Sequence, residues 1–161
     1  MRPMSRQRTV SETVTVDVSP EVAYDAVSDV TQMGRWSPEN TGGHLPSVGP
    51  VEVGTAFIGT NRRGSATWST ECTVIAAEPG VRFAFRVHRI GPRKPILTGR
   101  IATWEYRFEG VDGSSTRVTE TWTDDRRWPD WVAARFDKAV TGGQLFADHQ
   151  RKNIRRTLDR L

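Results

Sequence analysis

The stretch VTVDVSPEVAYDAVSDVTQMGRWSP, residues Val14–Pro38, decides the fold that the sequence predicts. Its valines continue an alternation with polar residues that begins at Val10, a period typical of a half-buried β-strand. A serine and a proline at positions 19 and 20 supply an N-cap hydroxyl and a first helical residue, so a short helix is expected through about Ser28. Asp29 begins a second, shorter helix, which the dipeptide Ser37-Pro38 ends.

Five further stretches alternate or are rich in β-forming residues, and turn signals containing glycine or proline separate them. They lie at about residues 55–62, 66–77, 82–89, 99–109 and 116–124. Residues 40–54 are rich in Gly, Pro and Ser and are expected to form a long loop before these strands. The pattern therefore predicts an antiparallel meander after the two short helices.

Beyond Trp128 and Pro129 the apolar residues, beginning with Trp131, follow a helical period. This period predicts a long amphipathic helix to the C-terminus with a break near Gly142-Gly143. A twisted antiparallel sheet with one apolar face needs a cover, and this helix is the only predicted element long enough to provide it. The expected fold class is therefore α+β, with a curved antiparallel sheet wrapped around a long C-terminal helix.

The length of 161 residues and a mean hydropathy of -0.54 favour one globular domain, expected over residues 10–161 after a disordered basic tail at residues 1–9. No apolar run is long enough for a membrane span or a secretory signal. The single cysteine, Cys72, excludes an internal disulfide framework. We expect a cytoplasmic protein, monomeric or homodimeric, with no integral membrane association.

The net charge of +4 and the isoelectric point near 9.8 raise the question of nucleic-acid binding. The charge excess is small, and the basic residues are spread along the chain without a known nucleic-acid motif. Only residues 151–160 form a dense basic cluster, which is typical of a solvated helix face. No nucleic-acid partner is therefore expected.

The covered face of the predicted sheet carries mostly aromatic side chains, assigned by alternation along each strand. Its predicted members are Phe57, Asn61, Trp68, Thr70, Phe83, Phe85, Trp104, Tyr106, Phe108, Val118, Glu120 and Trp122. Large rings on strands also form ordinary cores, and that interpretation stays open here. The polar members Asn61, Tyr106 and Glu120 instead need a buried hydrogen-bond partner or a cavity that holds water or ligand.

Glu120 is the most informative of the polar members because it lies between Val118 and Trp122 on an apolar face. An unpaired buried carboxylate costs several kcal/mol, so such a group either pairs with a cation or takes up a proton. Two interpretations follow: a salt bridge to an arginine, or a pocket acid with a raised pKa. A β-bulge that shifted the register by one residue would turn Glu120 outward.

Other chemistry has little support in the sequence. His44, His88 and His149 are far apart and lack the spacing of metal ligands, so no metal site is expected. Cys72 has the parity of a small buried residue, and nothing in the sequence places a base beside it. No dinucleotide fingerprint, P-loop or nucleophile elbow occurs, so no cofactor is expected.

The order of these segments resembles the START-like (SRPBCC) superfamily, in particular its bacterial polyketide cyclase/dehydrase-like and lipid-transport members. The resemblance begins with Val14–Pro38 and includes F-x-G-x-N-R-x-G at Phe57–Gly64 and A-E-P-G-x-x-F-A-F at Ala77–Phe85. It continues through W-x-Y-x-F from Trp104 and T-R-V-T-E-x-W from Thr116, and it covers nearly the whole chain beyond residue 9.

The resemblance implies a helix-grip fold, in which a seven-stranded antiparallel sheet encloses a largely apolar cavity against the C-terminal helix. Glu120, Tyr106 and Asn61 match pocket-facing positions of the family and, of these, Glu120 and Tyr106 are the candidate catalytic residues. The predicted ligand-binding set is the covered face described above without Phe108 and Val118, together with Phe146 and His149 on the terminal helix.

Two functions are compatible with this resemblance. The first is binding of a small hydrophobic ligand, whether lipid, polyketide or aromatic compound, in transport or sequestration. The alternative is a polyketide cyclase/aromatase or dehydratase that uses polar pocket residues as acid and base. Two carboxylates that point to one site would favour the enzyme, and one polar group among rings would favour the binding protein.

Overall fold

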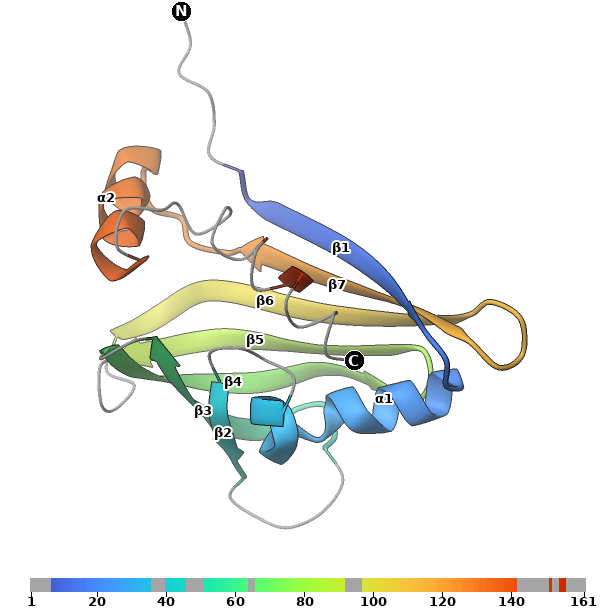
Figure 1. The fold of residues 1–161 in the computed structure, drawn as a ribbon. Helices are drawn as coiled ribbons and strands as arrows, with labels where there is room; N and C mark the ends of the chain where they lie inside the picture. The colour runs from blue at the N-terminus through green and yellow to red at the C-terminus, as the bar shows by residue number, and fades with distance from the viewer. Residues whose placement is uncertain are drawn as a thin grey trace, which may run out of the picture.

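The computed structural model describes residues 7–35, 40–45, 51–63, 66–91, 97–141, 151 and 154–155. Within them, seven antiparallel strands form one sheet in the order β1-β7-β6-β5-β4-β3-β2 (Figure 1). The strands are β1 (Thr9–Val16), β2 (Asn40–His44), β3 (Ala56–Arg63), β4 (Ala66–Glu78), β5 (Arg82–Gly91), β6 (Leu97–Gly110) and β7 (Thr116–Asp124). The helical elements are α1 (Pro20–Ser28), the 3₁₀ helix η1 (Val30–Arg35) and α2 (Asp130–Thr141). The two short helices after the first strand and the antiparallel meander are confirmed.

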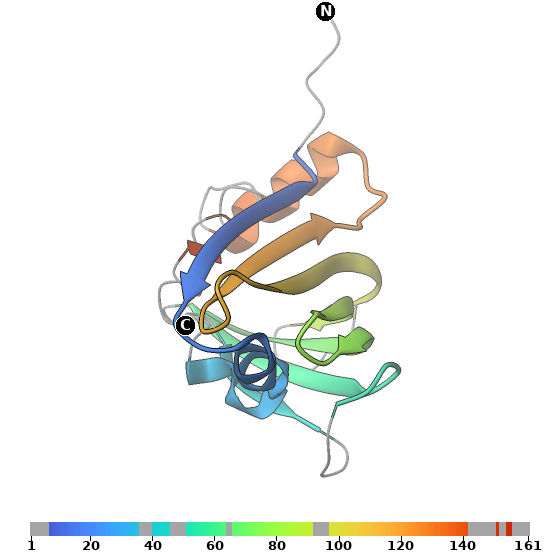
Figure 2. The same cartoon turned by 90° about the vertical axis from the view of Figure 1, so that its right-hand side faces the viewer.

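The sheet is strongly curved, and α1 lies on its concave side (Figure 2). The Ser19 hydroxyl accepts a hydrogen bond from the Val22 amide at 3.3 Å and caps the helix. Tyr24 of α1 then makes edge-on ring contacts with Phe83 and Phe108 of the sheet, at centroid distances of 6.2 and 5.6 Å. These contacts identify the face that carries Phe83 and Phe108 as the covered one.

The predicted loop over residues 40–54 is wrong at its start, because residues 40–44 form the edge strand β2 paired with β3. Gly43 of β2 lies so close to η1 that a Cβ atom there would be 2.2 Å from the Val30 carbonyl oxygen. A glycine-rich composition, read as a loop signal, here allows a strand and a 3₁₀ helix to approach each other.

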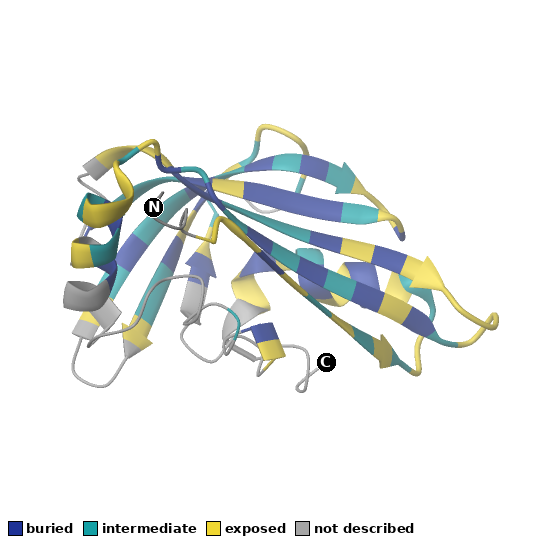
Figure 3. Cartoon of the chain, turned by 90° about the horizontal axis from the view of Figure 1, so that it is seen from above, coloured by how far each residue is buried: buried dark blue, intermediate teal, exposed yellow. Residues whose placement is uncertain are grey.

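Side chains alternate between buried and accessible along β7, whereas Phe83–Phe85 of β5 are buried in succession (Figure 3). In β7, Thr116, Val118, Glu120, Trp122 and Asp124 are buried, while the residues between them are exposed or half-buried. The bulge that would have turned Glu120 outward is absent from the regular registers of β7 with β1 and β6.

Two described segments that are far apart in the sequence, residues 7–16 and 154–155, meet at β1. The strand β1 begins at Thr9, and the Arg8 carbonyl accepts a hydrogen bond from the Asp124 amide. Residues 8 and 9 of the predicted tail are therefore part of the folded structure. Near the other end, Ile154 is fully buried in the main core, and Arg155 pairs with Glu12 at 3.3 Å. The long C-terminal helix and its break at residues 142–143 otherwise lie outside the described residues.

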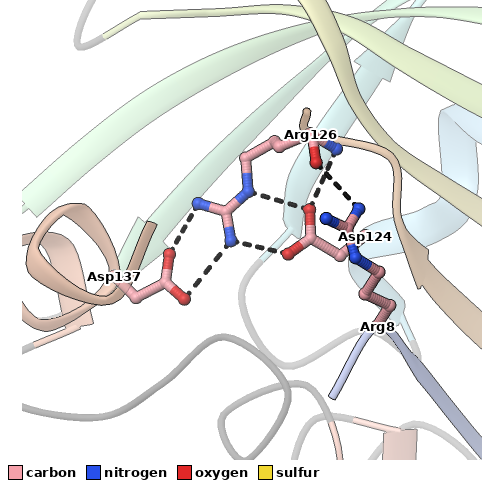
Figure 4. A network of polar contacts seen from close by, with 4 residues as sticks. All are labelled: Arg8, Asp124, Arg126 and Asp137. Atoms are coloured by element: carbon pink, nitrogen blue, oxygen red, sulfur yellow. Dashed lines mark hydrogen bonds and ion pairs between the residues drawn. The ribbon is translucent and has the colours of Figure 1, made fainter. Parts of the chain in front are cut away.

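The start of that predicted helix, α2, packs differently from the expectation. The helical period puts Trp131 on the apolar face, but its exposed fraction is 67%. The helix is instead attached by a buried polar cluster that the sequence analysis missed (Figure 4). Arg126 donates to Asp124 at 2.9 and 2.8 Å and to Asp137 of α2 at 2.6 and 3.3 Å, and all three residues are buried.

Candidate functional site

The candidate site is a row of polar side chains across three neighbouring strands on the concave face. In the strand registers, Glu120 of β7 lies directly opposite Tyr106 of β6 and directly opposite Glu12 of β1. Residues directly opposite each other on antiparallel strands point to the same face, with Cβ atoms about 5 Å apart. The carboxyl groups of Glu12 and Glu120 and the phenol of Tyr106 are therefore cross-strand neighbours on one face of the sheet, and we call them the polar row.

Glu120 is bonded to Tyr106 and to no arginine among the described residues. The Tyr106 hydroxyl donates to Oε1 of Glu120 at 2.7 Å, and both side chains are buried. Within the described part of the chain, Oε2 of Glu120 is buried and has no hydrogen-bond partner. No arginine of the neighbouring strands β1 and β6 pairs with Glu120, so the structure gives no support to a salt bridge from those strands, and Glu120 and Tyr106 lie on one face as expected.

Burial raises the pKa of Glu120 to about 8, and the hydrogen bond from Tyr106 counteracts only part of this rise. Burial also raises the pKa of Tyr106 well above its ordinary value, and the nearby Glu120 charge adds to the rise. At neutral pH the pair is therefore a carboxylic acid beside an uncharged phenol. Such a pair can donate hydrogen bonds or a proton, and it carries no fixed charge.

Glu12 is a site residue that the sequence analysis missed. Its carboxylate is half-buried and accepts a hydrogen bond from Arg155 at 3.3 Å. Its parity with Val10 and Val14 was a readable signal for the concave face, but strand alternation alone does not say which strand lies beside β1. The guanidinium of Arg155 is therefore the counter-ion of this second carboxylate.

Most of the predicted aromatic residues gather around this row. Phe57, Phe83, Phe85 and Trp122 are buried in one core cluster, and the half-buried Trp104 packs against it. The rings of Phe57 and Phe85 are 5.2 Å apart, and those of Phe83 and Phe85 are 6.0 Å apart. In the registers, Trp122 lies opposite Trp104, and Trp104 opposite Phe85, which forms a second row next to the polar one.

The structure does not bring Asn61, Trp68 and Thr70 to the polar row. Asn61 and Trp68 pair with each other at the far ends of β3 and β4, and all three residues are half-buried. Asn61 and Glu120 are four strand spacings apart in the sheet, each about 4.8 Å. These three residues remain predicted ligand contacts on β3 and β4, near the β2 edge of the sheet. Phe146 and His149, the predicted contacts from the terminal helix, lie outside the described residues.

Groups that could support other chemistry are placed elsewhere. Cys72 is buried, and burial raises the pKa of its thiol to about 12, so it is a protonated core residue. His88 shares a hydrogen bond with Thr73 at 2.9 Å, and His44 is exposed. The described residues contain no group of three or more His, Cys, Asp or Glu side chains that could hold a metal ion, and no helix long and apolar enough to cross a membrane.

The curved sheet of seven antiparallel strands, with α1 on its concave side, is consistent with the fold of START-like proteins. The chain belongs to the polyketide cyclase / dehydrase and lipid transport family, whose sequence model matches residues 7–161. Comparison with curated proteins gives no match.

Solved structures share the fold at low sequence identity. The di-domain ARO/CYC StfQ from the steffimycin biosynthetic pathway matches with a TM-score of 0.64 and 12% identity, over 93% of this chain and 42% of that one. This chain therefore spans less than half of the length of that di-domain protein. A START superfamily protein from Mycobacterium smegmatis matches with a TM-score of 0.60 and 16% identity, over 92% and 97% of the two chains. A polyketide-cyclase-like protein from Corynebacterium glutamicum has 26% identity, a TM-score of 0.53 and coverages of 96% and 83%.

Proposed function

We propose that this protein binds a small, largely apolar molecule against the concave face of its sheet, with the Glu120–Tyr106 pair as the polar anchor. The observation that carries the proposal is the buried Oε2 of Glu120, which has no partner within the described residues and lies in a surface of aromatic rings. Native proteins rarely leave such an atom unsatisfied, so a ligand or a water molecule at this place is the natural partner. Membership of a family that includes lipid transport supports the same function.

The proposed contacts combine the two rows on β5, β6 and β7 with the predicted residues of the terminal helix. The rings provide most of the binding free energy because each buried Å² of apolar surface contributes about 25 cal/mol. Trp104 is the ring best suited to a test, since it is only half-buried in the protein without ligand. Phe146 and His149 remain proposed contacts that lie outside the described residues.

The test is calorimetric titration with 2-ethylnaphthalene, an apolar probe without a polar group. Saturable 1:1 binding is expected, and Trp104→Leu should weaken it by about tenfold because part of the ring surface is lost. Trp131→Leu is the matched control, since Trp131 is exposed on α2 and lies outside the proposed contacts. Equal effects of the two substitutions, or no saturable binding, would contradict the proposal.

A second candidate function is acid–base catalysis on a polyketide chain, and the second carboxylate is the observation that favours it. Glu120 is buried beside a phenol, whereas Glu12 is half-buried beside a guanidinium. Two carboxyl groups in such different environments are able to take different roles, one as a proton donor and one as an acceptor. Family membership includes polyketide cyclases and dehydrases, which supports this candidate as well.

This candidate is tested by incubating the protein with a synthetic poly-β-ketone thioester and analysing the products by mass spectrometry. Cyclised or dehydrated products should form faster than in buffer, and Glu120→Gln should remove most of the acceleration while the thioester still binds. A product distribution identical to that in buffer would leave ligand binding as the function.

A further inference from the structure

One atom of the polar row, Oε2 of Glu120, is buried without a hydrogen-bond partner among the described residues. Oε1 of Glu120 is occupied by the Tyr106 hydroxyl at 2.7 Å, whereas Oε2 is buried and without a partner in the described residues. The apolar side chains of Val118 and Trp122 flank Glu120 on its own strand, and both are buried. A charged Oε2 would therefore have lost its water without gaining a donor, which is an expensive state for a carboxylate.

A proton on Glu120 removes this cost and fixes the direction of the hydrogen bonds. Because the Tyr106 hydroxyl donates to Oε1, the carboxyl proton belongs on Oε2. The protonated Oε2 is a hydrogen-bond donor that needs an acceptor. A carbonyl oxygen is an acceptor only, so it fits this group without carrying a charge into the apolar surface.

The charged groups around Glu120 disfavour charged ligands of either sign. Glu12, directly opposite on β1, presents a carboxylate that would repel an anion, and Tyr106 on β6 is uncharged. Arg151 and Arg155 are the described cations after α2: Arg151 donates to Gln7 at 2.8 Å, and Arg155 donates to Glu12 at 3.3 Å, which engages the Glu12 charge. A ligand with an ammonium group would therefore lose its hydration without finding an anion that is not already paired, so its binding is disfavoured.

We propose that the ligand presents an uncharged acceptor oxygen, such as a ketone carbonyl, to Oε2 of Glu120, and that the site discriminates against carboxylates and amines of the same shape. This inference rests on the proposed binding function and adds the chemical class of the ligand to it.

The experiment uses four naphthalene probes of similar size with the full-length protein: 2-acetylnaphthalene, 2-ethylnaphthalene, 2-naphthoate and 2-naphthylmethylamine. At pH 6.5 the ketone is expected to bind about tenfold more tightly than the hydrocarbon, as one added hydrogen bond in a buried site would give. The carboxylate and the amine are expected to bind more weakly than the hydrocarbon.

The variant Glu120→Gln and a pH series connect this preference to the proton on Glu120. At pH 9.5 the wild-type preference for the ketone should fall to about twofold or less, because the carboxyl group with its pKa of about 8 has lost its proton. The side-chain amide that Glu120→Gln introduces keeps a donor at every pH, so this variant should keep the preference at both pH values. Glu120→Leu should lose it at both. Glu109→Gln makes the same substitution at an exposed position on β6 and should behave like the wild type.

Each outcome decides between the two proposals. Equal binding of ketone and hydrocarbon would overturn the inference and leave apolar binding intact, as would tightest binding of the carboxylate or the amine. A ketone preference in the wild type that does not change with pH would also overturn it, because the donor would then be another group. Absence of saturable binding for all four probes would contradict the proposed function itself.

Discussion

Glu120 and Glu105 show how the two faces of one sheet give the same side chain opposite properties. Glu120 is on the concave face beside a phenol, and its pKa is raised to about 8. Glu105 of β6 accepts hydrogen bonds from Arg82 and Arg107, both at 2.7 Å. Its partial burial would raise its pKa, but the hydrogen bonds from Arg107 and Arg82 outweigh burial and lower it. The two carboxyl groups therefore affect stability in opposite pH directions.

Replacing Glu120 by Gln should change the pH dependence of stability. Between the pKa of an unfolded glutamate, 4.5, and about 8, the unfolded wild type loses a proton that the folded state keeps, so its free energy of unfolding falls by up to about 1.4 kcal/mol per pH unit. At pH 4 the variant should lie within about 1 kcal/mol of the wild type. At pH 9 it should be the more stable protein, as urea denaturation at both pH values would measure.

Glu105→Gln is the control with the opposite sign. The lowered pKa of Glu105 contributes stability above pH 4.5 that disappears as the pH falls below this value. The variant should therefore be less stable than the wild type at pH 7, by about 1 kcal/mol or less for partly exposed ion pairs, and the difference should disappear as the pH falls through the lowered pKa of Glu105. For the Glu120 prediction, the contrary result is a pair of parallel stability profiles for the wild type and Glu120→Gln, because these would show that folding does not raise the pKa of Glu120.

Alternation along single strands was sufficient to predict Glu120 and Tyr106, because the nearest neighbours of each on the same face of its strand are apolar. It was insufficient for Glu12, whose importance comes from the pairing of β1 with β7 at the other end of the sequence. The Glu120–Tyr106 bond likewise depends on the register between two strands. Single-strand patterns carry no information on such registers, so the choice between arginine and phenol partners required the structure.

At the scale of elements, the contact between β2 and η1 depends on the absence of a side chain at Gly43. A Cβ atom there would be 2.2 Å from the Val30 carbonyl oxygen, a backbone atom that moves only with η1. Gly43→Ala should therefore lower the free energy of unfolding by about 2 kcal/mol or more. Thermal and urea denaturation of purified variants would measure this loss.

Gly99→Ala on β6 is the matched control for this substitution. Apart from its two chain neighbours, no described residue has an atom within 4 Å of a Cβ at that position, and its backbone does not have a positive φ. This variant should be as stable as the wild type or about 0.5 kcal/mol more stable, since alanine suits a strand better than glycine. If Gly43→Ala were equally harmless, β2 and η1 would not pack as closely as the structure shows.

The strand β2 shows why the predicted loop failed. Composition favoured a loop because Gly, Pro and Ser are frequent over residues 40–54. Edge strands need few apolar residues, and the ladder with β3 supplies the backbone hydrogen bonds that a loop would leave to water. Long alternating runs such as β4 and β7 were placed to within one or two residues, because their pattern spans both faces of the sheet.

The attachment of α2 to the sheet depends on Arg126, which lies between the carboxylates of Asp124 and Asp137 (Figure 4). Arg126→Met would leave two buried carboxylates without this cation, so the free energy of unfolding should fall by about 3–5 kcal/mol. Arg86→Met at an exposed position of β5 should change it by less than about 0.5 kcal/mol. A loss below about 1 kcal/mol for Arg126→Met, measured by urea denaturation at pH 7, would mean that the cluster does not hold α2.

At the scale of the whole molecule, α1, η1 and the C-terminal segment complete a core that the sheet cannot close alone. The described core combines residues of nearly every strand with Val27 of α1, Val30 of η1 and Ile154 of the C-terminal segment. The family resemblance correctly predicted a sheet of seven antiparallel strands. The cavity and the terminal helix that it also implies remain predictions, because residues 142–150, 152–153 and 156–161 are outside the described part of the chain.

A chain ended at residue 141 tests whether the C-terminal segment is the cover that the sheet requires. It lacks Ile154, which is fully buried, and Arg155, which pairs with Glu12. The concave face would then expose aromatic surface, so the truncated chain is expected to aggregate or to unfold without cooperativity in size-exclusion and denaturation experiments. In the full-length protein, Ile154→Ala should cost about 2–4 kcal/mol, whereas Arg155→Gln should cost less than about 1 kcal/mol because this arginine is largely exposed. A soluble truncated chain that unfolds cooperatively, together with a neutral Ile154→Ala, would show that α1 and η1 cover the sheet without help from the C-terminal segment.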